Sequence, residues 1–513
     1  MLEKLRGLSP FGAKKSDHPL ADTRELRRVV DSLRADNSFK ALDDIVGWLE
    51  SLRDVPEFPV DRYYQAICRL DDAAQPHLKR LARDYLHSPR QSAAEEKRLW
   101  AICHDYWAAV AERYERCLEA SAATTRVGEH LRQALPALSA RLIVALGNVF
   151  KWTQFRHGPP DGRLWQRLGA ALLAAERAGI AGRVGAPREN MAGLGSPQQE
   201  YVKVVAMHAA SVESLTAIDI ELVERLIANF CSGFGFSAVG EIDSVYWVDL
   251  ALPVPPTRLA RMPQVAVATQ RFFKPATAHV GIAKLLHDLE RGHDVPADLA
   301  LGGQYHAQTL LPALRHLAAY LAPVPPQRRH DRHSVKQHAL IVHGFDQAFQ
   351  VISGTQPEPG ASSVEFWQIE NVSRGGFGAL LDTSPGQWLK VGALVAMQPN
   401  GGGNWLLGVV RRYLRLGESA AQVGIETLAL QAIPADLRVR ATSTYAAAAG
   451  IPALLIREAC APGELRALMP FASFSLRDTL ECELDRQRVQ LTPIAVVERR
   501  GDYELARFRL GSG

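Results

Sequence analysis

The hydrophobic pattern of the chain changes at a proline-rich segment, residues 323–326. Before this segment apolar residues recur at helical spacing, as they do in 39–52 and again in 99–114. After it, short β-branched and apolar runs alternate with turn-forming residues, a pattern typical of strands. Because proline fixes the backbone and cannot continue a helix, the segment predicts a short, stiff linker between an α-helical region and a β-rich region.

A chain of 513 residues is too long for one hydrophobic core, so several domains are expected. The predicted fold class is an α+β multidomain protein with a large, mainly α-helical N-terminal region, an antiparallel β-barrel and a second β-rich domain at the C-terminus. The predicted divisions are a flexible tail at 1–21, an α-helical domain at 22–180, a mainly α region with one or two strands at 181–322, a barrel with an arginine arm at 323–432, and a β-rich domain, either a second barrel or a sandwich, at 433–513.

Strand-like runs in the β-rich half are short and separated by turn signals, which favours a small antiparallel barrel. Those expected for the barrel are His338–His343, Gln347–Ile352, Val364–Ile369, Leu394–Gln398, Trp405–Leu414 and Gln422–Leu428. Those expected for the C-terminal domain are Ala453–Arg457, Thr479–Leu484, Val489–Glu498 and Tyr503–Arg509. Gly401–Gly403 predicts a hairpin turn, because neither a helix start nor a Lys-Ser/Thr pair follows it as in a phosphate-binding loop.

Charge and cysteine content exclude several classes of protein. The 59 basic and 55 acidic side chains nearly balance, so no strong field for a nucleic-acid polymer is expected. The first residues lack the apolar core of a signal peptide, and the apolar stretches are shorter than a membrane span, so a cytoplasmic protein without a transmembrane segment is predicted. The six cysteines form no CxxC pair and are expected to be buried thiols, without a metal or a disulfide framework.

Three arginines directly after the linker, Arg328, Arg329 and Arg332, are followed downstream by the segment Asn371–Gly376, which reads Asn-Val-Ser-Arg-Gly-Gly. The planar donors of arginine grip phosphate in pairs, and the flat guanidinium can stack on a purine. Asn and Ser at a strand end can hydrogen-bond a ligand or the turn, and the two glycines permit unusual backbone angles and close approach. These residues therefore predict an anion site closed by a flexible arm.

The pair of motifs Arg328-x-x-x-Arg332 and Asn371-x-Ser373-x-x-Gly376 resembles the signature of the PilZ family over about residues 327–431. The resemblance implies a PilZ-like barrel that binds cyclic di-GMP, commonly as a stacked dimer, with the arginines on phosphate and guanine. It also implies that Asn371 and Ser373 face a guanine edge. The implied ligand-binding residues are Arg328, Arg329, Arg332, Asn371, Ser373, Gly375 and Gly376.

The resemblance implies an effector in bacterial second-messenger signalling that needs no cofactor and is not an enzyme. The chain lacks the GGDEF and EAL signatures of enzymes that make or degrade cyclic di-GMP. We expect the ligand to order the arginine arm and re-orient the barrel against the helical region, which would engage a protein partner. One alternative is a constitutive interaction scaffold whose barrel binds no nucleotide, and another is an enzyme hidden in the helical half.

Four histidines, His330, His333, His338 and His343, lie near the arginine arm. Their spacing matches no standard metal site, and alternation along a strand would separate them. They are therefore expected at the surface or at the rim of the ligand site.

Overall fold

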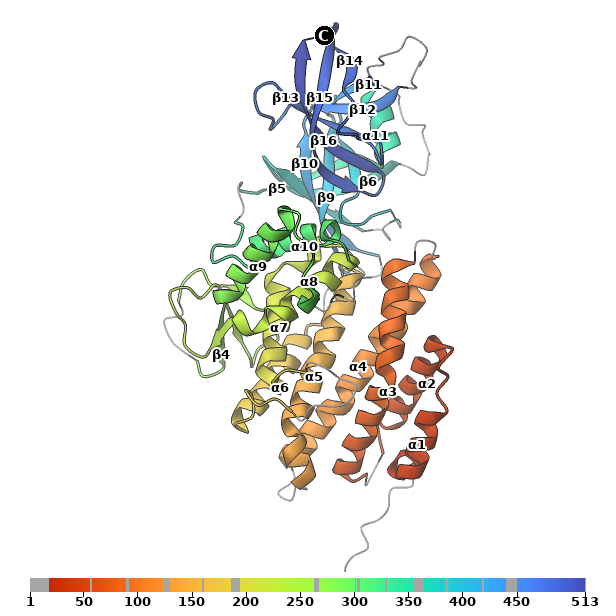
Figure 1. Cartoon of the computed structure of the whole chain (residues 1–513), viewed down its shortest axis with the longest axis vertical. Helices are drawn as coiled ribbons and strands as arrows, with labels where there is room; N and C mark the ends of the chain where they lie inside the picture. The colour runs from red at the N-terminus through yellow and green to blue at the C-terminus, as the bar shows by residue number, and fades with distance from the viewer. Residues whose placement is uncertain are drawn as a thin grey trace, which may run out of the picture. The chain divides into compact units, whose positions relative to one another are not determined.

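The computed structural model divides the chain into two compact units, Met1–Arg156 with Pro160–Pro326, and His157–Pro159 with Gln327–Gly513. The first unit is mainly helical and the second contains two closed antiparallel barrels (Figure 1), so the predicted fold class is confirmed. The residues that the structure describes are 18–55, 58–88, 92–123, 129–158, 161–185, 194–262, 267–299, 301, 305–327, 330–354, 364–382, 386, 388–417, 419–439 and 450–512.

The helical unit packs its helices around one hydrophobic core, which includes side chains from both helical segments of the sequence, before and after residue 180. Its helices are α1 (Thr23–Asp31), α2 (Ser38–Ser51), α3 (Val60–His87), α4 (Ala93–Ala123), α5 (Glu129–Phe155), α6 (Leu164–Arg177), α7 (Pro197–Ala209), α8 (Ala217–Asn229), α9 (Ala276–Glu290) and α10 (Ala307–Tyr320). A small sheet lies between α8 and α9 in the sequence. Its strands β1 (Gly235–Ser237), β2 (Tyr246–Asp249), β3 (Thr257–Arg258) and β4 (Gln270–Lys274) are in the order β1-β4-β2-β3.

Local capping residues determine where several of these helices begin. The Asn37 side chain accepts a hydrogen bond from the backbone N–H of Lys40, and the hydroxyl of Ser196 accepts one from that of Gln199. The Gln199 side chain reaches back to the backbone N–H of Ser196 and completes a capping box. Such caps satisfy donors that have no partner inside the helix.

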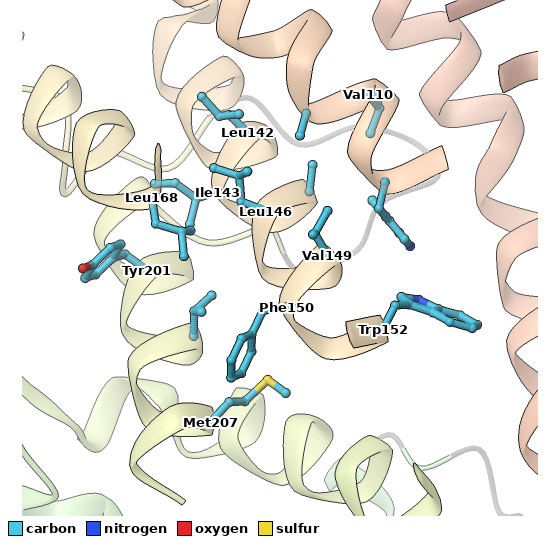
Figure 2. Packing of buried hydrophobic residues seen from close by; sticks show 14 of the residues in the cluster. Val110, Leu142, Ile143, Leu146, Val149, Phe150, Trp152, Leu168, Tyr201 and Met207 are labelled. Atoms are coloured by element: carbon cyan, nitrogen blue, oxygen red, sulfur yellow. The ribbon is translucent and has the colours of Figure 1, made fainter. Parts of the chain in front are cut away.

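Helix α5 is the centre of this core (Figure 2), where Leu146 and Phe150 pack among side chains of α4, α6 and α7. Its segment Leu131–Phe155 is long and apolar enough to cross a membrane by length and composition alone. In the folded unit 61% of the most apolar window is buried, and the helix carries the buried cations Arg141 and Lys151. A core helix packed on several sides needs the same apolar composition as a span.

A polar network crosses the core between α3, α4 and α5. The Asp71 carboxylate accepts hydrogen bonds from the hydroxyls of Tyr106 (2.7 Å) and Tyr114 (2.6 Å) and from the Arg141 guanidinium, which also donates to Asp72 (2.8 Å). Burial, reinforced by the negative charge of Asp71, raises the pKa of both tyrosines well above the ordinary value. Both hydroxyls therefore keep the protons that they donate at neutral pH, and the buried guanidinium of Arg141 is paired, as a buried charge requires.

The first barrel is a closed sheet in the order β10-β7-β6-β5-β8-β9 with antiparallel neighbours. Its strands are β5 (His333–His343), β6 (Val364–Ser373), β7 (Gly376–Leu381), β8 (Leu394–Pro399), β9 (Leu406–Arg415) and β10 (Ala421–Ala429). Side chains such as Ile341, Trp367 and Val423 alternate with outward residues and fill its interior. Gly401–Gly403 lie in the connection between β8 and β9, as the sequence predicts.

One strand prediction was wrong. The run Gln347–Ile352 lies in helix α11 (Phe345–Ile352), which begins directly after β5. Phe345, Ala348 and Val351 are spaced three residues apart and bury one face of this helix, so their period is helical. A short apolar run fits both the strand period and the helix period. Here the burial of one face makes the segment a helix.

The C-terminal segment forms a second closed barrel, in the order β11-β12-β13-β16-β15-β14, so the expected β-rich domain is a barrel and not a sandwich. Its strands are β11 (Ile433–Val439), β12 (Ile451–Ile456), β13 (Glu464–Pro470), β14 (Leu480–Leu484), β15 (Gln487–Arg500) and β16 (Tyr503–Ser512). Within unit 2 the barrels share a hydrophobic cluster that joins Leu407 and Val409 of the first barrel to Leu468 and Tyr503 of the second. Separating the two barrels would expose the apolar side chains of this shared cluster to water. The two barrels are therefore expected to behave as one body.

Candidate ligand site on the first barrel

The site predicted from the sequence centres on the turn between β6 and β7. Ser373 and Gly376 are paired across this turn, with the exposed Arg374 and Gly375 between them. The Ser373 hydroxyl donates to the carbonyl of Gly376 (3.1 Å), and the Gly375 carbonyl accepts from the N–H of Thr427 (3.1 Å). The turn is therefore tied both to itself and to β10.

Gly376 is required by the neighbouring strand. Its φ is 155°, and a Cβ at this position would lie 2.0 Å from the carbonyl oxygen of Ile425 in β10. No side chain fits without separating β7 from β10. In contrast, a Cβ on Gly375 would meet only the ring of His330, at 3.3 Å.

Asn371 has an unsatisfied polar atom. Its Oδ1 is buried and has no hydrogen-bond partner among the residues that the structure describes. The amide lies over Gly378 of β7, where a Cβ would be 2.7 Å from Nδ2 and 2.9 Å from Oδ1. Since buried acceptors are nearly always paired, this unpaired oxygen needs an explanation, and a donor from a ligand is one candidate.

The structure describes residues 330–332 of the arginine arm. Arg328 and Arg329 lie outside the described residues. Arg332 is exposed and directly precedes His333, the first residue of β5, which pairs with Val372 of β6. The described residue His330 lies beside Gly375. The arm thus enters the barrel at the Ser373 end of β6, so Arg332, Asn371, Ser373, Gly375 and Gly376 lie in one region.

The sequence prediction missed Gly378 and Arg374. Gly378 provides the space for the Asn371 amide, and a glycine inside a strand is a recognised sign of such close approach. Arg374 is exposed and makes no ion pair to any described residue, so it adds positive charge at the turn. Both residues lie within or next to the motif and could have been found from it.

The histidines near the arm have separate surroundings. His338 stacks on the exposed Phe366 (5.0 Å between ring centroids), and His343 stacks on Trp388 (4.1 Å). Burial lowers the pKa of His343, although Glu365 and Asp502 oppose the shift. Within the described part of the chain no group of three or more His, Cys, Asp or Glu side chains could hold a metal ion.

Comparison with known families identifies two matching segments. Residues 24–239 match the family model described as the N-terminal domain of the cyclic-di-GMP receptor FimW. Residues 327–434 match the model described as the middle PilZ domain of the same receptor. The two matches cover more than half of the chain, and the second ends as β11 begins. No curated protein matches the chain.

Proposed function

Because this chain belongs to the family of PilZ-domain cyclic-di-GMP receptors, we propose that it binds cyclic di-GMP on the first barrel and acts as an effector of this second messenger. The proposed contacts are Arg328, Arg329, Arg332, Asn371, Ser373, Gly375 and Gly376. The observation that carries the assignment is the buried, unpaired Oδ1 of Asn371, which lies on the barrel wall where the arginine arm enters. The family is one of receptors, and we propose no catalytic role.

Guanine suits the unpaired acceptor. The base carries N–H donors on its Watson–Crick edge, so the Asn371 Oδ1 would gain the hydrogen bond that it lacks in the protein. The Ser373 hydroxyl, held at the same strand end by the Gly376 carbonyl, can rotate to present a lone pair or its proton to the ligand. Recognition of a polar edge by a buried acceptor gives specificity, because a base without the donor leaves the acceptor unpaired.

We assign the phosphate contacts to the arginine arm. Arg328, Arg329 and Arg332 provide guanidinium forks for the phosphates of the ligand, and a guanidinium plane can stack on a guanine. Arg374 at the turn adds a further positive charge without an ion-pair partner among the described residues. Such a cluster is costly to assemble without an anion and is stabilised by binding one.

The position of the arm suggests how binding could reach the rest of the protein. Arg328 and Arg329 follow Gln327, the residue at which the second unit resumes after Pro326. Ordering these residues on a ligand would restrict the link between the helical unit and the barrels. We propose that this restriction re-orients the barrels against the helical unit and thereby changes the affinity for a protein partner, which requires that cyclic di-GMP bind one arrangement more tightly than the other.

Calorimetric titration of the full chain with cyclic di-GMP tests the site. The double variant Arg328→Ala with Arg332→Ala should weaken binding by at least about tenfold, since each charge-assisted contact contributes about 1.5–3 kcal/mol. The matched control removes two exposed arginines of the second barrel, Arg477→Ala with Arg488→Ala, and should bind as the wild type does. Equal weakening by both double variants would refute the site assignment.

Small-angle X-ray scattering of the same proteins tests the proposed re-orientation of the barrels. Cyclic di-GMP should change the scattering curve of the wild type and leave that of the Arg328/Arg332 double variant unchanged. If the wild type binds the ligand without a change in scattering, the re-orientation is wrong and the site assignment stands. If the wild type does not bind the ligand at all, the alternative of a constitutive scaffold is favoured.

A further inference from the structure

A row of paired residues crosses the outer wall of the first barrel, with one residue on each of four neighbouring strands. Asn371 of β6 pairs with Gly378 of β7. Gly378 pairs with Gly424 of β10, which pairs in turn with Arg412 of β9. Because neighbouring strands lie about 4.8 Å apart, the row is about 14 Å long between its outer Cα atoms. Its two ends are polar, and its middle carries no side chain.

Irregular pairing directs both ends of this row to the outer face. The register shifts by one residue between Ile369 and Asn371 of β6, and again between Val410 and Arg412 of β9. Ile369 and Val410 both point into the barrel, so regular alternation would place the side chains two positions further along in the core as well. In β9 the next interior side chain is Tyr413 instead. One extra residue in each strand therefore turns the amide and the guanidinium outward, as β-bulges do beside functional sites.

The two glycines allow these side chains to lie across the sheet. A Cβ on Gly378 would be 2.7 Å from Nδ2 of Asn371. A Cβ on Gly424 would be 3.2 Å from Cβ, 3.8 Å from Cγ and 3.9 Å from Cδ of Arg412, so the stem of this arginine runs along the glycine. Glycine inside a strand commonly marks such close approach. The amide and the arginine stem thus lie over β7 and β10 from opposite ends of the row.

The adjacent Arg411 has a different role. Its guanidinium donates to Glu426 (2.6 Å) and to both carboxylate oxygens of Glu498 (2.6 and 2.8 Å). These ion pairs hold Arg411 within the second unit, where it links β9 to β10 and to β15. Arg412, in contrast, is exposed on the wall that carries Asn371. Of the two adjacent arginines, Arg412 is therefore the one placed to meet a ligand on this wall.

Guanine carries groups that complement both ends of the row. Its Watson–Crick edge presents N–H donors, which suit the acceptor oxygen of Asn371, and its O6 and N7 accept a bidentate pair of hydrogen bonds from arginine. Adenine has an amino donor where guanine has O6, so it cannot accept the same pair. A guanidinium at this edge of the base would consequently favour guanine over adenine.

We propose that Arg412 is a further ligand contact, which donates to O6 and N7 of the guanine whose other edge faces Asn371. This inference rests on the proposed binding of cyclic di-GMP to the first barrel. It assigns base specificity to a residue outside both sequence motifs, on a strand that the motifs do not include.

Calorimetric titration of the full chain with two ligands tests this contact. One ligand is cyclic di-GMP, and the other is its analogue with 7-deazaguanine in place of both guanines, which keeps the phosphates and the Watson–Crick edges but lacks the N7 acceptors. The wild type should prefer cyclic di-GMP by at least about fivefold, the effect of a hydrogen bond from a charged donor. This preference should fall by at least about threefold in Arg412→Ala, because the cycle of two proteins and two ligands isolates the contact between the changed groups.

The matched control, Arg477→Ala, removes an exposed arginine of the second barrel and should keep the wild-type preference. Circular dichroism checks that both variants remain folded. An Arg412 that contacts only phosphate, or only stabilises the barrel, would weaken both ligands equally in Arg412→Ala and leave the preference unchanged. That result overturns this inference while the proposed function stands, whereas a wild type that does not bind cyclic di-GMP overturns both.

Discussion

Replacement of Gly378 by alanine separates the role of the Asn371 amide from the stability of the barrel. The added Cβ would lie 2.7 Å from Nδ2 and 2.9 Å from Oδ1 of Asn371, too close for either atom to stay in place. These atoms are the far end of a side chain, so the amide can rotate away without moving the backbone. Gly378 is in an ordinary strand conformation, where alanine lowers the entropy of the unfolded chain and offsets part of the collision.

The expected effect on cyclic di-GMP binding follows from the lost contact. A displaced Asn371 amide would lose the proposed hydrogen bond from the guanine edge and leave a donor of the ligand unpaired, which costs about 1–3 kcal/mol, or roughly 5- to 150-fold in affinity. The free energy of unfolding should change by less than about 1 kcal/mol, since the entropy gain and the rotation of the amide oppose each other. Gly378→Ala should therefore bind as poorly as Asn371→Ala while it remains folded.

Calorimetry of the full chain measures the affinity, and hydrogen exchange of the β6 and β7 peptides measures local stability. Gly403→Ala is the matched control, because it makes the same substitution on the same barrel with no atom within 4 Å of the new Cβ. Wild-type affinity in Gly378→Ala, or an equal loss in Gly403→Ala, would refute the role given to the Asn371 amide.

Three further predictions concern the stability of the two units. Gly376→Ala should cost at least about 2 kcal/mol, from the collision with the Ile425 carbonyl and the strained φ, and should raise hydrogen exchange in β7 and β10; wild-type protection there would contradict this. Burial lowers the pKa of His208 from 6.5 to about 4, so the unfolded chain binds more protons than the folded chain between these values. Stability should consequently fall by about 2 kcal/mol between about pH 7 and about pH 5, and His208→Gln should lose this part of the dependence in urea unfolding followed by helix circular dichroism; an unchanged slope would contradict the assignment. Leu468→Ala in the cluster shared by the barrels should cost about 2–5 kcal/mol and raise hydrogen exchange in both barrels, whereas a rise in the second barrel alone would show that they are not coupled.

The helical and β-rich halves of the chain could be predicted because their patterns are long and regular. Helices such as α3 and α5 repeat an apolar stripe over many turns, and buried residues alternate with more exposed ones along most of β10. Short segments carry less information. The six residues Gln347–Ile352 satisfied a strand pattern, yet they form most of α11, because one face of that helix is buried against the barrels.

The residues of the candidate site were also accessible from the sequence, because their types and order carry the chemistry of phosphate and purine recognition. The structural roles of the individual residues, in contrast, could not be predicted from the sequence. The sequence predicted that Gly376 permits close approach, and the structure shows that the backbone carbonyl of Ile425 in β10 is the group that approaches it. The role of Gly378 depends on Asn371 of the neighbouring strand, which is a contact between strands and not a local pattern.

By itself, the sequence determined the fold class and the motifs, since hydrophobic period and residue chemistry are properties of short stretches of chain. The tertiary structure decided everything that depends on residues distant in the sequence. It closed the C-terminal strands into a second barrel that shares a hydrophobic cluster with the first, left the Asn371 acceptor buried and unpaired, and placed Arg412 at the other end of the same row across the barrel wall. These features arise from packing and desolvation, and a side chain acquires them only when segments far apart in the chain meet.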